Sequence, residues 1–162
     1  MHFDLLDPRL HDRDGFFCGE PTLDAYLRKQ AGQHQRDGIA TTHVLVDDID
    51  VARILGYCSL AAAQMNLQDL RPADRKRLPG YPVPAVRIGR LAVASGEQGN
   101  GYGSLLLGHA VNCSVRLRGQ LGVRVLLADA LNDRAAAFYR DHGFHATTTE
   151  RTRTLYLPLG KG

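Results

Sequence analysis

The chain has 162 residues and a mass of 17.8 kDa, a length that predicts one domain spanning residues 1–162. Hydrophobic residues make up 44% and charged residues 23% of it, which excludes a disordered or collagen-like chain. No apolar run reaches the ~18–20 residues of a membrane span and the N-terminus lacks a signal peptide's features, so we expect a soluble cytoplasmic protein without membrane contact.

The formal net charge of +3 is mild, but the charges are unevenly distributed. Residues 1–24 hold six acids against two arginines, a balance of −4. Residues 71–90 hold six basic residues against Asp74 alone, a balance of +5. A basic stretch can be a solvated face, and it is also typical of a protein that binds a polyanion. The charges alone leave both interpretations open.

The three cysteines are odd in number, widely spaced and without a CxxC pair, which argues against a disulfide framework and a thiolate zinc site. They are Cys18, Cys58 and Cys113. We expect reduced thiols that pack as small apolar groups. The histidines considered as metal ligands, His109, His142 and His145, show no carboxylate or cysteine at ligand spacing, so no metal is expected.

Hydrophobic periodicity and turn residues predict mixed helices and strands from the first third of the chain onward. A helix from Pro21 to about Gln35 precedes two strands, 41–46 and 54–62, which a hairpin turn at 47–50 joins. Residues 66–85 carry four prolines and much of the basic stretch. They are expected to form a long loop with one helical turn at 72–77.

The second half of the chain continues this alternation. A strand is expected at 86–93, where Gly89 predicts a bulge or a close backbone approach. The elements expected after it are a glycine-rich turn at 96–103, an amphipathic helix at 102–118, a strand at 123–128, a helix at 133–141 and closing strands at 147–157. This order predicts an α+β fold.

The sharpest local signal is the turn Gln98-Gly99-Asn100-Gly101-Tyr102-Gly103-Ser104, which lies between a strand and a helix. Glycines there allow positive φ and a close approach of the backbone to a ligand. The amides of the first helical turn and the helix dipole form an anion site that suits a pyrophosphate. The spacing matches neither a Rossmann fingerprint nor a P-loop, and a tight turn without a ligand has the same pattern.

With its flanks, this turn resembles the acetyl-coenzyme A signature of the GNAT family of N-acetyltransferases: Arg90-Leu91-Ala92-Val93 precedes it and an apolar helix follows. Residues 132–144 resemble the family's second signature, Asn-x-x-Ala-x-x-Phe-Tyr-x-x-x-Gly-Phe. The resemblance implies an acetyl-CoA-dependent N-acetyltransferase. It also implies the GNAT fold, a mixed, mostly antiparallel central sheet with a splayed strand pair and helices on both faces.

The resemblance further implies a role for each matching residue. Backbone amides of Leu91 and Val93 would hold the pantetheine arm and the thioester carbonyl, and Tyr139 would protonate the departing thiolate. The coenzyme contacts are expected from Leu91, Ala92, Val93, Gln98, Gly99, Asn100, Gly101, Tyr102, Gly103, Ser104, Asn132, Ala135 and Phe138. The alternative for Tyr139 is an aromatic side chain that only packs in the core.

The strand that ends at Val93 carries no Asp or Glu to deprotonate the acceptor amine. Attack by an already neutral amine, or deprotonation through a water chain, is therefore favoured over a side-chain base. An α-amino group has a pKa of ~8 against ~10.4 for a lysine side chain, so it depends less on such a base. This departure from many relatives favours an α-amine as acceptor.

Other segments resemble a narrower subgroup, the GNAT toxins of bacterial toxin–antitoxin modules, and with the two signatures the similarity covers about residues 3–158. The segments are Phe16-Phe17-Cys18-Gly19, Leu55-Gly56-Tyr57-Cys58-Ser59-Leu60-Ala61 and Pro82-Val83-Pro84. This resemblance implies acetylation of the α-amine of aminoacyl-tRNA, a block of translation, neutralisation by a ribbon–helix–helix antitoxin, and a homodimer.

In that interpretation the basic stretch holds RNA phosphates, and the residues expected to do so are Arg75, Lys76, Arg77, Arg87 and Arg90. The same charges suit an acidic antitoxin tail. Two alternatives stay open: a GNAT enzyme that acts on a small amine or a protein N-terminus, and a coenzyme-binding module without catalysis.

Overall fold

The structure is a computed structural model that describes residues 1–147 and 153–160. These residues form two compact units. Unit 1 comprises Met1–Ala61 and Gly89–Ala110, and unit 2 comprises Ala62–Ile88 and Val111–Gly162. No helix within the described ranges is both long enough and apolar enough to cross a membrane.

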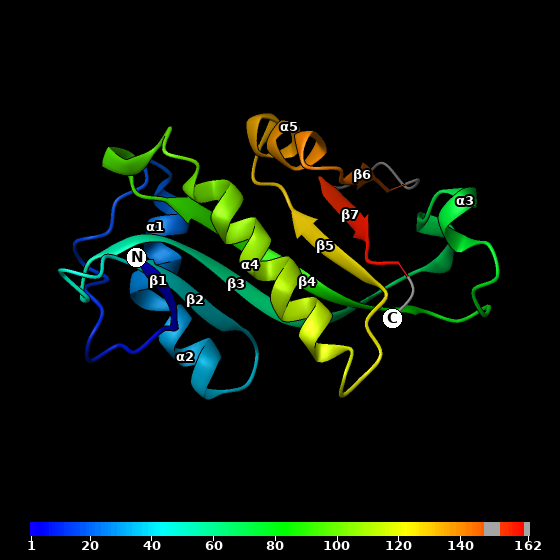
Figure 1. The fold of residues 1–162 in the computed structure, drawn as a ribbon, viewed down its shortest axis with the longest axis horizontal. Helices are drawn as coiled ribbons and strands as arrows, with labels where there is room; N and C mark the ends of the chain where they lie inside the picture. Colours follow the sequence, from blue (N-terminus) through cyan, green and yellow to red (C-terminus); the bar gives the residue numbers. More distant parts are fainter. Residues whose placement is uncertain (148–152, 161–162) are drawn as a thin grey trace. The chain divides into compact units, whose positions relative to one another are not determined.

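Helices and strands alternate along the chain, as the sequence predicts (Figure 1). In chain order they are β1 (His2–Leu5), α1 (Pro21–Lys29), α2 (Ala31–Arg36), β2 (Thr41–Val46), β3 (Ile54–Met65), α3 (Pro72–Arg75), β4 (Val83–Val93), α4 (Tyr102–Leu117), β5 (Val125–Asp129), α5 (Asp133–Asp141), β6 (His145–Ala146) and β7 (Thr154–Pro158). Single 3-10 turns lie at Leu67–Asp69 and Ser95–Glu97.

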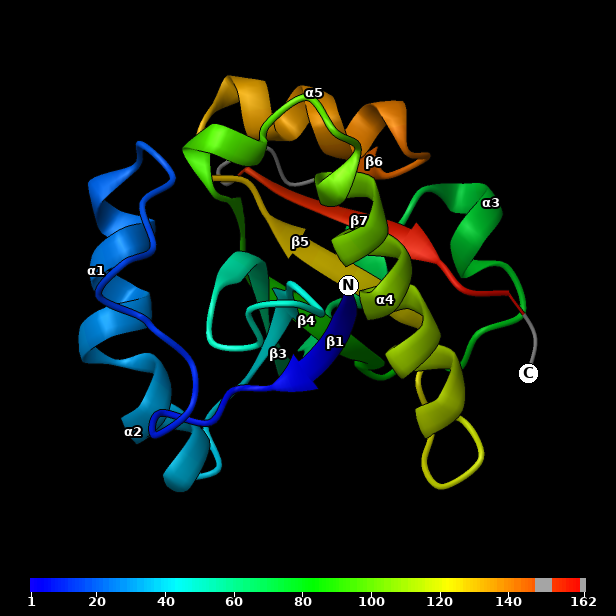
Figure 2. The same ribbon diagram turned by 60° about the vertical axis from the view of Figure 1, so that its left-hand side comes forward.

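In unit 1, β1, β2 and β3 form antiparallel pairs in that order. Strand side chains alternate between the two faces of a sheet. Val44 and its partner Tyr57 belong to a buried cluster with Tyr26 and Leu27 of α1, whereas His43 on the opposite face contacts His109 of α4. Helices therefore cover both faces of these strands, which confirms the predicted arrangement (Figure 2).

Two glycines of unit 1 lie where the backbone approaches other atoms closely. A Cβ added to Gly56 would lie 2.8 Å from Leu106 Cδ1 and 2.9 Å from the carbonyl oxygen of Ala92. A Cβ added to Gly89 would lie 3.2 Å from Ser59 Oγ. The close approach predicted at Gly89 is confirmed, and Gly56 lets α4 and β4 pack tightly on β3.

In unit 2 the strand order is β4-β5-β7-β6, with β4 and β5 parallel and the other pairs antiparallel. The β4–β5 ladder runs from Ala85 opposite Val125 to Ile88 opposite Ala128. Although β4 continues to Val93, the described part of the chain adds no further pair to this ladder. The splayed strand pair that the resemblance implied is confirmed.

The structure corrects the expected helix from Pro21 to Gln35, which is two helices. Gln30 leaves the helical region with φ −123° while its amide still bonds to the Tyr26 carbonyl, and α2 begins at the next residue. The break turns α2 toward the sheet. There the Gln35 side-chain amide donates to the Leu6 carbonyl at 2.9 Å and accepts from the Thr42 amide at 3.0 Å.

Other boundaries also differ from the prediction. Strand β1 was not expected, because its four residues are too few to show a period and it forms only by pairing with β2. The helical turn expected at 72–77 ends early at Arg75, since Lys76 leaves the helical region with ψ 129° and Arg77 has a positive φ of 67°. Of the closing strands predicted at 147–157, β7 lies in that range, whereas β6 ends before it at Ala146 and was not predicted. Residues 148–152 lie outside the described residues.

A pair of histidines packs between β2 and the first half of α4. His43 Nδ1 and His109 Nε2 share a hydrogen bond of 2.9 Å, and the Phe3 ring stacks on the His109 ring with centroids 4.1 Å apart. Burial, and to a smaller extent the neighbouring His109, lower the pKa of His43 from 6.5 to about 4. His43 is therefore neutral in the folded protein at neutral pH.

We expect the free energy of unfolding to fall as the pH drops from about 6.5 to about 4. In that range the unfolded chain binds a proton at His43 that the folded chain does not, so acid favours unfolding. Urea unfolding at a series of pH values measures this slope, and His43→Gln should make it shallower. Equal slopes for the variant and the wild type would show that His43 does not titrate in this way.

Candidate active site

The end of β4 in unit 1 carries the first group of predicted coenzyme residues. Ala92 is buried in the core cluster beneath α1, whereas Leu91 and Val93 on either side of it are half-buried. Because side chains alternate along a strand, Leu91 and Val93 point away from that cluster. Beyond Val93 the Ala94 amide donates to the Leu55 carbonyl at 2.9 Å, which keeps the chain on β3 as it leaves the strand.

The glycine-rich loop that follows has the backbone conformation that its sequence predicts. Gly99 and Gly101 have φ values of +90° and +80°, in the left-handed region that favours glycine. A Cβ at either position would meet no heavy atom within 4 Å, so the glycines serve the backbone and leave open space beside it. These features suit a loop that a phosphate group can approach closely.

Helix α4 begins directly after this loop. The amide of Leu105 donates to the Gly101 carbonyl at 3.2 Å. The amides of Tyr102 and Gly103 lie in the first turn of the helix, before this bond, where backbone amides lack an intrahelical acceptor. With the dipole of a 16-residue helix behind them, they form an anion site of the kind that holds a pyrophosphate.

The side chain of Gln98 makes two hydrogen bonds that the sequence did not predict. Its Nε2 donates to the carbonyls of Cys18 and Val93, each at 3.1 Å, and the neighbouring Ser95 amide donates to the Phe17 carbonyl at 2.8 Å. Gln98 therefore holds the end of β4 and the segment before α1 in one arrangement. Sequence reasoning assigned Gln98 to the coenzyme and missed this contact, because no local pattern links positions 18 and 98.

Asp24 and Cys18 form a buried polar contact at the start of α1. Asp24 is 3% exposed, and its Oδ1 accepts from the Cys18 amide at 2.9 Å. Burial, and to a smaller extent the Asp24 carboxylate, raise the pKa of the Cys18 thiol to about 12. Cys18 is therefore a packed thiol rather than a nucleophile, as the sequence predicts.

Arg90, one of the residues expected to bind RNA, lies over the ring of Tyr26 with its guanidinium carbon 3.5 Å from the ring centroid. This is a cation–π contact. The Tyr26 hydroxyl in turn shares a hydrogen bond of 3.1 Å with His34 Nδ1. Arg90 is thus held against α1.

We expect Gln98→Met, which removes both donors at similar size, to weaken acetyl-CoA binding and to expose Cys18. Each lost hydrogen bond should lower stability by about 0.5–1.5 kcal/mol, because two carbonyls lose a donor. Thermal shift with acetyl-CoA and mass-spectrometric alkylation of Cys18 measure the two effects.

Gly101→Glu is the contrasting variant, because its carboxylate occupies the open space at the anion site. It should abolish the acetyl-CoA-dependent shift while Cys18 stays protected. If Gln98→Met leaves Cys18 as unreactive as in the wild type, Gln98 does not hold that segment.

In unit 2, α5 carries the second group of predicted residues. Asn132 caps the helix, since its Oδ1 accepts from the Ala135 amide at 2.9 Å. Tyr139 is 3% exposed, and its ring lies 5.2 Å from that of Phe144 and 5.5 Å from that of Phe138 between centroids. Gly143 has φ +92°, which allows the turn that returns Phe144 to the helix. The second signature thus defines a capped helix and an aromatic cluster that positions Tyr139.

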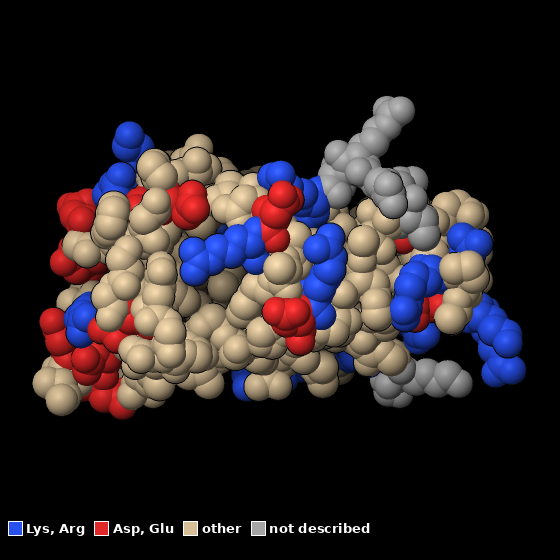
Figure 3. All heavy atoms as spheres, turned by 90° about the horizontal axis from the view of Figure 1, so that it is seen from above, with Lys and Arg blue, Asp and Glu red and all other residues tan. Residues whose placement is uncertain are grey.

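The basic residues of unit 2 differ in what they contact. Arg87 is paired with Asp129 through Nη1 and Oδ1 at 2.5 Å, so its charge is neutralised. Arg75 donates to the Gln68 side chain at 3.2 Å, and Lys76 and Arg77 are exposed. Within residues 1–147 and 153–160, none of Arg75, Lys76 and Arg77 forms a salt bridge with a carboxylate. Figure 3 shows Lys and Arg gathered around α3 and the loop after it.

The expectation that no cysteine lies at ligand spacing from His109 is wrong. Cys113 follows His109 by four residues on α4, which places the two at ligand spacing on one helix face. Burial raises the pKa of the Cys113 thiol.

The model of the GNAT acetyltransferase domain matches residues 38–146 of the chain. The chain belongs to this family, and it is an acetyltransferase with the GNAT fold.

Several relatives are more specific. The chain is 36% identical over 152 residues to a tRNA-acetylating toxin of Mycobacterium tuberculosis, covering 92% of this chain and 89% of the relative. A structure of AtaT complexed with acetyl-methionyl-tRNAfMet superposes with a TM-score of 0.90 at 28% identity, covering 97% of this chain and 94% of the other.

A tyrosine-to-phenylalanine mutant of the AtaT toxin, bound to acetyl-CoA and to the C-terminus of the antitoxin AtaR, superposes with a TM-score of 0.83. It is 27% identical to this chain, and the match covers 98% of this chain and 92% of the other.

Proposed function

We propose that this GNAT enzyme transfers the acetyl group of acetyl-CoA to the α-amine of aminoacyl-tRNA and thereby blocks translation as the toxin of a toxin–antitoxin pair. The observation that carries the proposal is the basic run Arg75, Lys76 and Arg77, which no carboxylate neutralises among the described residues. A run of unneutralised Arg and Lys attracts the phosphate backbone of a nucleic acid, so it favours an acceptor that is attached to RNA. The Mycobacterium tuberculosis relative, named for tRNA acetylation, supports the same acceptor.

Acetyl-CoA supplies an activated thioester, and the residues of unit 1 bind and orient it. The amides of the first turn of α4 and the loop at Gly99 and Gly101 hold the pyrophosphate, while the amides of Leu91 and Val93 donate to the pantetheine arm and the thioester carbonyl. Ala92 anchors this strand in the core, and Gln98 fixes its end.

The transfer forms a C–N bond between the acceptor nitrogen and the acetyl carbon and breaks the C–S bond of the thioester. The α-amine attacks in its neutral form and loses its extra proton to water, because the end of β4 offers no carboxylate. Tyr139 gives its hydroxyl proton to the departing thiolate and regains one from solvent. Capping by Asn132 and packing against Phe144 hold the Tyr139 ring in one position.

Further proposals follow from the same function. The coenzyme's pantetheine arm is lined by Asn132, Ala135 and Phe138. Arg87 and Arg90 contribute less to RNA binding than the basic run does, because Asp129 and Tyr26 already hold their guanidinium groups. A ribbon–helix–helix antitoxin neutralises the enzyme through an acidic tail that binds the basic run Arg75, Lys76 and Arg77. The enzyme works as a homodimer in the cytoplasm, where aminoacyl-tRNA is found.

The deciding experiment mixes the purified protein with labelled acetyl-CoA and either charged or deacylated total tRNA. We expect label only on charged tRNA, released with the amino acid by mild alkaline deacylation. Changing Arg75, Lys76 and Arg77 together to Glu should weaken the transfer and its dependence on salt, because fewer counterions are released. Arg116→Glu, at an exposed position on α4, is the matched control and should retain the wild-type rate.

No label on charged tRNA, with ready acetylation of free polyamines or peptides, would instead assign the protein to the small-amine alternative.

A separate prediction concerns Tyr139. We expect Tyr139→Phe to lower kcat by ~10²–10⁴-fold with little change in the Kd for acetyl-CoA, since the ring remains and only the proton donor is lost. Single-turnover rates and coenzyme titration separate the two quantities. A variant with nearly the wild-type rate would mean that water protonates the thiolate.

A further inference from the structure

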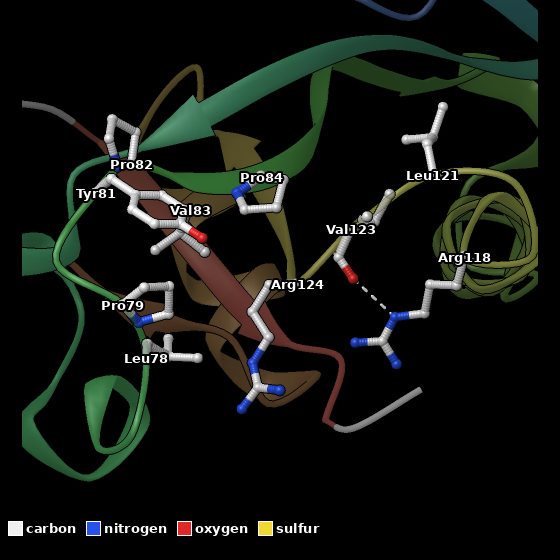
Figure 4. Close-up of a pocket in the computed structure, with 11 residues that line it drawn as sticks. Leu78, Pro79, Tyr81, Pro82, Val83, Pro84, Arg118, Leu121, Val123 and Arg124 are labelled. Atoms are coloured by element: carbon white, nitrogen blue, oxygen red, sulfur yellow. Dashed lines mark hydrogen bonds between the residues drawn. The ribbon is translucent and has the colours of Figure 1, made fainter.

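A second candidate site lies wholly within unit 2. A pocket of about 410 Å³ is formed by the loop after α3, the start of β4 and the connection from α4 to β5 (Figure 4). Its volume lies in the ~300–1,000 Å³ range of small-ligand sites. Its walls are mostly apolar, with Leu78, three prolines, Val83, Leu121 and Val123 among the lining residues. None of the residues assigned above to acetyl transfer lines it.

The pocket has an exposed aromatic wall. Tyr81 is 65% exposed, whereas Val83 and Val123 behind it are 4% and 5% exposed. The Tyr81 ring lies beside Pro82 and above Val83 in Figure 4. Pro82, which directly follows Tyr81, restricts the backbone on that side of the ring. An exposed aromatic ring is a surface on which a planar group can stack.

Two arginines form the opposite side of the pocket, and they differ in how firmly hydrogen bonds hold their guanidinium groups. Arg118 donates through Nε to the Val123 carbonyl at 2.7 Å, through Nη1 to Leu159 at 3.0 Å and through Nη2 to Gly160, so all of its nitrogens hold the backbone. Arg124 has one long bond of 3.3 Å, from Nη1 to the Gly160 carbonyl. Arg118 therefore builds the wall, and Arg124 can turn toward a ligand.

The charge around the pocket has one sign. The two segments that line it, residues 78–84 and 118–124, contain Arg118 and Arg124 and no Asp or Glu. The basic run ends at Arg77, directly before the lining residue Leu78. An occupant with negative charge and a flat apolar group complements this lining, and an unpaired nucleotide has both.

We propose that this pocket is a subsite for one unpaired nucleotide of the RNA acceptor, with the base stacked on Tyr81 and its phosphate bound by Arg124. The inference rests on the proposed function, since it places part of the tRNA on the enzyme. An acidic peptide would match the charge but would leave the Tyr81 ring without a planar partner. The pocket thus adds affinity for the acceptor and leaves the coenzyme reaction itself unchanged.

The test measures binding of a single-stranded oligoribonucleotide and of deacylated tRNA by fluorescence anisotropy. Tyr81→Ala should raise the Kd of the oligoribonucleotide by about 5- to 150-fold, which is the range for loss of one base–aromatic stack. Tyr81→Phe keeps the ring and should bind like the wild type. Arg124→Gln should reduce the salt slope by about 1, as expected for one phosphate contact. Arg116→Gln is the control for loss of an exposed charge and should change neither quantity.

Acetylation of charged tRNA separates this inference from the proposed function. Tyr81→Ala should raise KM for charged tRNA and leave both kcat and KM for acetyl-CoA unchanged, with an unaltered melting temperature. If the wild type acetylates charged tRNA and Tyr81→Ala has the same KM and oligoribonucleotide affinity, the subsite is overturned alone. If RNA binds through Tyr81 but no acetyl group is transferred to charged tRNA, the proposed function fails alone.

Poly-glutamate provides the last arm. If Tyr81→Ala leaves RNA affinity unchanged, and Arg124→Gln abolishes the displacement of the oligoribonucleotide by poly-glutamate, the pocket belongs to an acidic peptide and the nucleotide subsite is overturned.

Discussion

The end of strand β4 is the constraint on which the coenzyme site depends. The Gln98 side chain donates hydrogen bonds to the carbonyls of Cys18 and Val93. The backbone amides of Ala94 and Ser95 donate to the carbonyls of Leu55 and Phe17, respectively. These bonds fix the direction in which the chain leaves the strand and therefore the direction in which the loop enters α4. The anion site at the helix N-terminus is useful only if that direction is constant, because its amides bind at short range.

The two family signatures combine binding with local folding. Gly99 and Gly101 adopt conformations that other residues rarely reach, and they also clear the space beside the loop. Asn132 caps α5, and Gly143 lets Phe144 pack against Tyr139. A residue with two such tasks tolerates few replacements, which is a physical reason why short motifs identify this fold.

The charges show how a basic sequence is divided between structure and binding. Arg71 pairs with Asp74, whose carboxylate also accepts from the Tyr156 hydroxyl at 2.6 Å, and these contacts hold the pKa of Asp74 below its usual value. Arg87 is paired with Asp129, whereas the run at 75–77 retains its charge. Two of the six basic residues in the stretch 71–90, Arg71 and Arg87, are thus paired with carboxylates within unit 2, so a count of basic residues overstates the charge that is free for a polyanion.

The sequence by itself determined the class of fold, the enzyme family, the glycine-rich loop before α4 and the position of Tyr139 in a short helix. Those features are local: glycine conformation, helix capping and hydrophobic period depend on residues a few positions apart. The single domain and the individual coenzyme contacts stay predictions. Only the tertiary structure decided that Gln98 reaches Cys18, that Arg87 meets Asp129, that His43 is buried against His109, and that Tyr81 and Arg124 border one pocket. Each joins segments 37 or more residues apart in the sequence, and pairing and packing at that range leave no periodic signal.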